Sequence, residues 1–75
     1  MNKIRRKKID KIQDEILELV SKLQDILYEE EDCFENMPEN LQGSERGEIS
    51  QNAIDIMSNT IENIETAANE LSDID

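Results

Sequence analysis

The sequence predicts an all-α protein, an antiparallel two-helix hairpin that dimerises into a four-helix bundle. Three observations predict this fold. Apolar residues recur at alternating spacings of three and four, the period of an amphipathic helix. One break, at residues 37–44, divides the pattern into two helices. The apolar stripes are also wider than one hairpin can bury, and 75 residues make a marginal core, so a second copy is expected to cover the rest.

The first helix is expected at about residues 3–36. Its seam is formed by Ile9, Ile12, Ile16, Leu19, Leu23 and Ile26, and Val20 and Leu27 widen the stripe on one side. Glu30 then falls on the seam itself. Because a carboxylate in an apolar contact is costly, the two helices are expected to splay or to open to water at this point.

The turn is expected at residues 37–44. Pro38 lacks an amide hydrogen and disfavours helix at the residue before it, so it ends the first helix. Gly43 is expected to take a positive φ, and Ser44 to cap the second helix. A short linker between two amphipathic helices predicts an antiparallel hairpin, and residues 1–75 are expected to form a single domain.

The second helix is expected at about residues 45–73, with a seam of Ile54, Met57, Ile61, Ile64, Ala68 and Leu71. The antiparallel register pairs Ile26 with Met57, Leu23 with Ile61, Leu19 with Ile64, Ile16 with Ala68 and Ile12 with Leu71. Every layer of this register is apolar, which supports the hairpin. The residues expected to be most buried are Ile16, Leu19, Leu23, Ile61 and Ile64.

The charges are distributed very unevenly. There are 19 acidic and 8 basic residues, a net charge of −11. Six of the eight basic residues lie in residues 1–11, the basic arm, which carries +5, whereas residues 12–75 carry −16. A one-sided field of this kind attracts basic proteins and repels nucleic acid, so direct nucleic-acid binding is not expected.

Acidic residues crowd the C-terminal end of the first helix, where the helix dipole disfavours them. Nothing in the predicted fold requires them there. We therefore predict a partner-binding site for a basic protein at Glu29, Glu30, Glu31, Asp32 and Glu35, with Tyr28 as an apolar anchor.

Enzymatic chemistry is not expected. The chain has no His, no Gly-rich phosphate loop and no Cys/His metal spacing, so no cofactor or metal is predicted.

Cys33 is the only cysteine, which excludes an internal disulfide and indicates a reducing compartment. No apolar run approaches about 18 residues, so no membrane span is predicted. These features indicate a cytoplasmic protein.

The segment from Glu35 to Arg46 reads ENMPENLQGSER and is followed by an Ile- and Asn-rich helix. It resembles the turn, PENLQ-x-SER, that joins two helices in small acidic proteins of phages and prophages of gut-type bacteria. The resemblance covers roughly the second half of the chain, and the basic arm is not part of it. Such proteins are mostly of unassigned function, so the resemblance implies a phage context and no particular activity. If the chain is phage-encoded, the expected location is the cytoplasm of the host cell.

The leading functional hypothesis is a phage-type inhibitor that binds a basic surface of a host defence protein, as a DNA mimic or an anti-CRISPR-like inhibitor. That hypothesis rests on an analogy of charge and size. One alternative is a structural or assembly adaptor in which the acids only provide solubility. Another is an antitoxin-like binder of a basic partner. Nucleic-acid binding through the basic arm is the least favoured, because the rest of the chain would repel the polymer.

Overall fold

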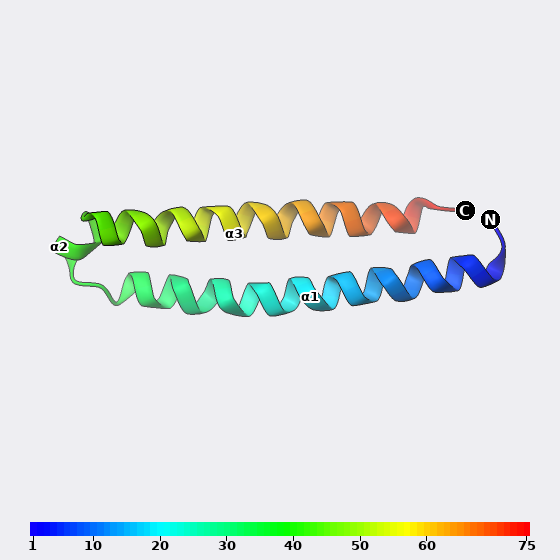
Figure 1. Ribbon diagram of the computed structural model, residues 1–75, viewed down its shortest axis with the longest axis horizontal. Coiled ribbons are helices and arrows are strands. Elements are labelled where there is room, and N and C mark those ends of the chain that lie inside the picture. Colours follow the sequence, from blue (N-terminus) through cyan, green and yellow to red (C-terminus); the bar gives the residue numbers. More distant parts are fainter.

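The chain folds as two long helices that run side by side in opposite directions. The computed structural model describes all residues from Met1 to Asp75. Helix α1 (Lys3–Glu35) and helix α3 (Glu45–Glu70) are joined through the one-turn helix α2 (Glu39–Gln42), and a 3-10 turn, η1 (Leu71–Asp73), extends α3 (Figure 1). Both termini lie at one end, and α2 lies at the other end, the tip. The predicted all-α fold and its helix bounds are confirmed to within a few residues.

Helix α1 begins with a side-chain cap. The Oδ1 atom of Asn2 accepts a hydrogen bond from the backbone N–H of Arg5 at 2.8 Å, which satisfies one of the unpaired donors of the first turn. The helix ends at Glu35, three residues before Pro38 and one residue short of the predicted end.

The turn differs in detail from the prediction. Gly43 has a φ of −87° and no glycine has a positive φ, so the expected left-handed glycine is wrong. Ser44 is the N-cap residue of α3, but its hydroxyl donates to the carbonyl of Leu41 and makes no capping bond. The turn is held instead by Gln42, whose Nε2 donates to the carbonyls of Phe34 at 3.0 Å and Met37 at 3.2 Å.

Gly47 is the glycine that the turn requires. It is buried under α2, and a Cβ at this position would lie 2.6 Å from the carbonyl oxygen of Leu41 and still closer to the carbonyl of Gln42. The absence of a side chain therefore lets α2 fold back onto the first turn of α3.

The core is a short apolar cluster between the two long helices. Val20, Leu27 and Ile61 are buried in it, and Leu23, Ile54, Met57 and Ile64 pack around them half-buried. Near the open end, the Nε2 of Gln13 donates to the carbonyl of Ala68 at 2.9 Å and to Oγ of Ser72 at 2.7 Å. These bonds place α1 and α3 close to the predicted register.

One predicted set of core contacts is wrong. Ile12, Leu19 and Ile26 were expected to face Leu71, Ile64 and Met57, but they are 50%, 63% and 53% exposed. Helix α1 instead turns the edge that carries Val20 and Leu27 toward α3. Of the other predicted core residues, Ala68 is also buried, and Ile9, Ile16 and Leu71 are half-buried. The physical reason is that the apolar stripe of α1 is too wide for one neighbouring helix, so α3 covers one edge and leaves the other open.

The hairpin is extended. Its radius of gyration is 17.3 Å, against about 11 Å for a compact chain of this length. Its accessible surface is 5864 Å², against about 4,700 Å² for a compact monomer of 8.7 kDa. The chain alone therefore leaves an unusually large part of its surface in contact with water.

Candidate functional site

The predicted partner-binding residues occupy the last two turns of α1, next to the tip. Tyr28, Glu29, Asp32 and Glu35 are exposed, whereas Glu30 and Glu31 are half-buried. Tyr28, Asp32 and Glu35 follow a spacing of four and three residues, which places them on one face of the helix. The tyrosine ring is 58% exposed beside these carboxylates, so a partner surface could reach all three.

Glu30 has a structural role that the sequence did not predict. Its Oε1 accepts a hydrogen bond of 2.8 Å from the hydroxyl of Ser50 on α3, and Ser50 is only 3% exposed. Of the two expected outcomes, splaying is not needed, because the carboxylate has a donor across the contact. Glu30 is half-buried and keeps part of its surface in water, which was the other expectation. Ser50 lies one turn before Ile54 in the apolar seam of α3, and this polar interruption opposite Glu30 was the available signal.

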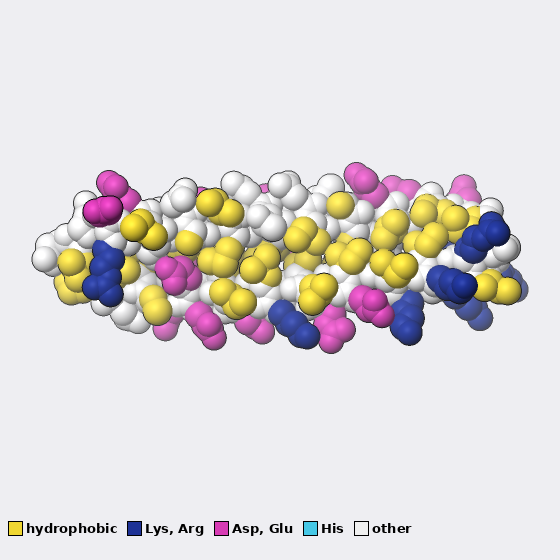
Figure 2. Space-filling view, in the orientation of Figure 1, with side chains coloured by type: hydrophobic (Ala, Val, Ile, Leu, Met, Phe, Trp, Pro, Cys, Tyr) yellow, Lys and Arg dark blue, Asp and Glu magenta, His cyan; other side chains and the backbone are white.

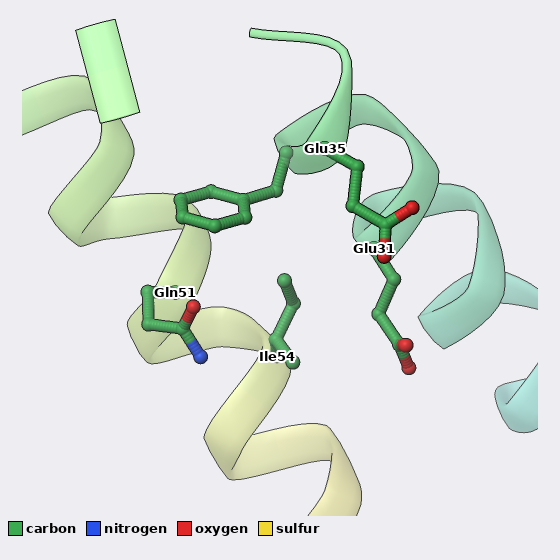
Figure 3. A pocket seen from close by; sticks show the side chains of 5 residues that line it. Glu31, Glu35, Gln51 and Ile54 are labelled. Atoms are coloured by element: carbon green, nitrogen blue, oxygen red, sulfur yellow. The ribbon is translucent and has the colours of Figure 1, made fainter. Parts of the chain in front are cut away.

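A shallow hollow of about 260 Å³ lies between the helices at this end. Its lining comes from two helices: Glu31, Phe34 and Glu35 from α1, and Gln51 and Ile54 from α3. Figure 3 shows the two glutamates on one side of the hollow and Gln51 on the other, with Ile54 between them. The amide of Gln51 is held by a bond of 3.0 Å from its Nε2 to Oδ1 of Asp55.

The chemistry of this hollow suits a basic side chain. Two carboxylates stand beside an apolar floor, and the site is open to solvent. Lys and Arg combine an aliphatic stem with a charged head, so the stem can cover apolar surface while the head meets the carboxylates. The sequence predicted the two glutamates as site residues, but it missed Phe34, Gln51 and Ile54, which become neighbours only through the hairpin.

A second surface of interest is apolar. Hydrophobic side chains run along the middle of one face of the hairpin for most of its length, and charged side chains lie along its edges (Figure 2). Ile12, Leu19 and Ile26 are exposed and recur at intervals of seven, which places them on one face of α1; we call them the exposed stripe. An exposed apolar strip of this kind is typical of an interaction surface.

The hollow and the exposed stripe lie on opposite sides of the α1–α3 contact. Successive residues of an α-helix are rotated by about 100°. The residues before and after Phe34 are therefore rotated from it in opposite directions. The residue before it, Cys33, continues the exposed stripe, and the residue after it, Glu35, lines the hollow. A molecule bound to one surface leaves the other accessible.

The remaining chemistry of the surface is sparse. No group of three or more Cys, Asp or Glu side chains is placed to hold a metal ion. Neither long helix contains a stretch apolar enough to cross a membrane. Cys33 is a free and exposed thiol.

Comparison with protein-family models, with curated proteins and with solved structures finds no match for this chain. The arguments for its function come from its own two surfaces.

Proposed function

We propose that this protein is a non-enzymatic binding protein that attaches to a basic surface of a partner protein through the acidic hollow at its tip. The hollow is the observation that carries the proposal. It places the carboxylates of Glu31 and Glu35 beside the apolar side chains of Phe34 and Ile54. A projecting Lys or Arg of the partner would fill this hollow with both its stem and its charge.

Long-range charge supports the same proposal. The net charge of −11 attracts a basic surface before contact and speeds encounter. After contact, the exposed ring of Tyr28, which shares a helix face with Asp32 and Glu35, supplies apolar area of the kind that slows dissociation.

Inhibition follows if the partner works through a basic groove. A nuclease or another nucleic-acid-binding defence protein of a bacterial host holds phosphates with Lys and Arg. Carboxylates on a rigid helix would occupy those side chains and exclude the nucleic acid. In a phage context the protein would then act as an inhibitor of host defence, as a DNA mimic or in an anti-CRISPR-like manner. An antitoxin would bind a basic toxin by the same chemistry.

The proposal can be tested by capture from a bacterial lysate with a matched pair of variants. E31Q/E35Q removes the two charges of the hollow and keeps side-chain size, and E62Q/E70Q removes two exposed charges from α3. We expect the wild type and E62Q/E70Q to enrich one basic protein, and E31Q/E35Q to lose it. The capture should also fail at about 0.5 M salt, where the Debye length is only a few ångströms.

Inhibition is then measured directly. Purified captured protein is assayed for nucleic-acid binding with increasing amounts of wild type and of E31Q/E35Q. Loss of nucleic-acid binding with the wild type alone supports the inhibitor. Equal capture by E31Q/E35Q, or retention of nucleic acid by this protein itself, would contradict the proposal.

The exposed stripe favours a second role, as a structural or assembly adaptor, and with it the predicted homodimer. Two hairpins that bury their apolar faces against each other would form a four-helix bundle. Sedimentation equilibrium tests this directly. A folded monomer at micromolar concentration would exclude the bundle and leave the inhibitor proposal intact, because the hollow is built within one chain.

A further inference from the structure

We propose that a second copy of this chain covers the exposed stripe in an antiparallel arrangement, so that the basic arm of each copy lies along the acidic end of α1 in the other. The inference rests on the homodimer proposed above and specifies its geometry and its register. It assigns a role to the basic arm, which the proposed binding of a basic partner does not use.

The size of the open face agrees with a second copy. The whole hairpin extends 58 Å by 15 Å along its two longer axes, so the side seen in Figure 2 projects to an area on the order of 900 Å². That is large enough for the roughly 800 Å² that each partner contributes to a standard interface. The excess accessible surface of the isolated hairpin over a compact monomer, about 1,100 Å², is of the same size.

The exposed stripe is self-complementary about its own centre. A two-fold axis beside Leu19 places this residue opposite Leu19 of the partner subunit, and Ile12 opposite Ile26 of the partner subunit. Such a relation is what a C2 interface requires, because the same surface must meet itself.

Helix α3 fits the same axis. Gln51 lines the hollow on one flank of the α3 seam. The column on the opposite flank, which has small residues in its middle, therefore adjoins the open face: Ala53, Thr60, Ala67 and Ile74. Three hydrogen bonds define the register of α1 against α3: those from Gln13 to Ala68 and Ser72, and that from Ser50 to Glu30. In this register the midpoint between Thr60 and Ala67 lies at about the level of Leu19. The axis therefore also sets Thr60 against Ala67 of the partner subunit, where small side chains allow two helices to approach closely.

Charges along the edge of the exposed stripe select the antiparallel direction. The column beside the stripe, on the side away from α3, is Lys8, Glu15, Lys22 and Glu29, all exposed and alternating in sign at every heptad. Antiparallel pairing about Leu19 brings Lys8 to Glu29 of the partner subunit and Glu15 to Lys22 of the partner subunit. A parallel arrangement, with its two-fold axis along the helices, would not bring this column against itself, so the pairing of opposite charges would be lost.

The same column fixes the register. A shift by one heptad would bring Lys8 to Lys22 of the partner subunit and Glu15 to Glu15 of the partner subunit. Every contact in the column would then be repulsive. Alternating flanking charges that penalise wrong partners in this way are the usual means by which coiled coils specify orientation.

The arrangement accounts for the uneven charge of the whole chain. Residues 3–11 of each copy, which hold six basic residues, lie beside residues 27–35 of the other, which hold the acidic cluster. The cluster stands at the C-terminal end of α1, where its own helix dipole opposes it, and the neighbouring arm offsets that cost. The hollow stays open at both ends of the dimer, because it lies on the other side of the α1–α3 contact.

Distance measurement on the native cysteine tests this geometry. Cys33 is the only cysteine and is exposed, so the wild-type chain accepts a single nitroxide label for double electron–electron resonance. In the antiparallel dimer the two labels are separated by the helical rise from position 5 to position 33, roughly 42 Å at 1.5 Å per residue. A second label, on K7C in a C33S background, faces away from both helix contacts and should give about 36 Å by the same reckoning.

Each outcome of the distance measurement decides the inference. The two long distances support it. Distances below about 25 Å for both labels would mean that the tips lie together, since helices in a bundle are only 8–10 Å apart, and would overturn the antiparallel arrangement while keeping the dimer. Cys33 continues the exposed stripe and so lies at the proposed contact, whereas K7C lies outside it. No dipolar interaction for the K7C label at any concentration would therefore overturn the dimer itself. None of these results bears on whether a basic partner binds the hollow.

A charge-exchange experiment tests the register separately. K8E/K22E makes the flanking column wholly acidic, and E15K/E29K makes it wholly basic. By sedimentation at low salt, each variant alone should self-associate roughly tenfold or more weakly than the wild type, because every pair becomes repulsive. Their equimolar mixture should form a heterodimer of at least wild-type affinity, provided that circular dichroism finds both variants helical. Self-association of either variant at the wild-type level would refute the register.

Discussion

Replacing Gly47 with Ala should destabilise the hairpin, although alanine is the better helix former. In an ordinary helix interior the substitution would stabilise by about 1 kcal/mol. Here the new Cβ would lie 2.5 Å from the carbonyl carbon of Gln42 and 2.6 Å from the carbonyl oxygen of Leu41. Both are backbone atoms, so α2 must move by about an ångström to restore an ordinary contact of roughly 3.5 Å.

The expected magnitude follows from these contacts. Overpacking of this kind costs about 1–3 kcal/mol. A displaced α2 also weakens the two bonds that Gln42 donates to Phe34 and Met37, at about 1 kcal/mol each. After subtraction of the gain in helix propensity, we expect a net loss of about 1–3 kcal/mol. In a domain of this size that is a fall in Tm of about 4–8 °C for each kcal/mol.

The matched control is Gly43→Ala. Gly43 has no atom within 4 Å of a Cβ and an ordinary negative φ, so this substitution should be neutral or stabilise by up to about 1 kcal/mol. Both variants and the wild type are melted at one protein concentration and followed by circular dichroism, because association would otherwise shift Tm. A Tm for G47A equal to or above that of G43A would refute the argument that α2 packs on Gly47.

Three further predictions concern the helix contacts. Val20 is 3% exposed, so Val20→Ala should lower the free energy of unfolding in urea by about 2 kcal/mol. Leu19→Ala should leave the helicity of the hairpin unchanged and weaken self-association in sedimentation. An equal loss of stability in both variants would mean that α3 contacts both edges of α1. Ser50→Ala should cost about 1–2 kcal/mol, because Glu30 loses its donor while half-buried. Glu30→Gln keeps an acceptor for the Ser50 hydroxyl and should therefore cost less than Ser50→Ala in the same assay; the reverse order would contradict the bond between them.

The helices were predictable because their signals are local in the sequence. The apolar period marks α1 and α3, Pro38 follows the end of α1 by three residues, and a short linker leaves an antiparallel hairpin as the simplest connection. The width of the α1 stripe was also readable, since it depends only on which residue types share a helix face.

The side of α1 that faces α3 was not predictable from this pattern. The column with Leu19 and Ile26 and the column with Val20 and Leu27 are both apolar over several turns, and both adjoin Leu23. The periodicity favoured the first column, because Gln13 interrupts the second, but it does not show which of two adjacent apolar columns packs against the other helix. The structure buries the column with Val20 and Leu27, so that Phe34 in the same column reaches the hollow and Gln13 reaches Ala68.

The candidate site divides in the same way. The sequence by itself determined that acidic residues gather at the end of α1 and basic residues at its start, because charge is a property of each residue. Only the tertiary structure decided that Glu30 serves the fold through Ser50, that Glu31 and Glu35 share a hollow with Ile54, and that Gly47 admits α2. The physical reason is that each of these depends on contact between two helices, and contacts are set by the shapes of side chains from distant parts of the chain.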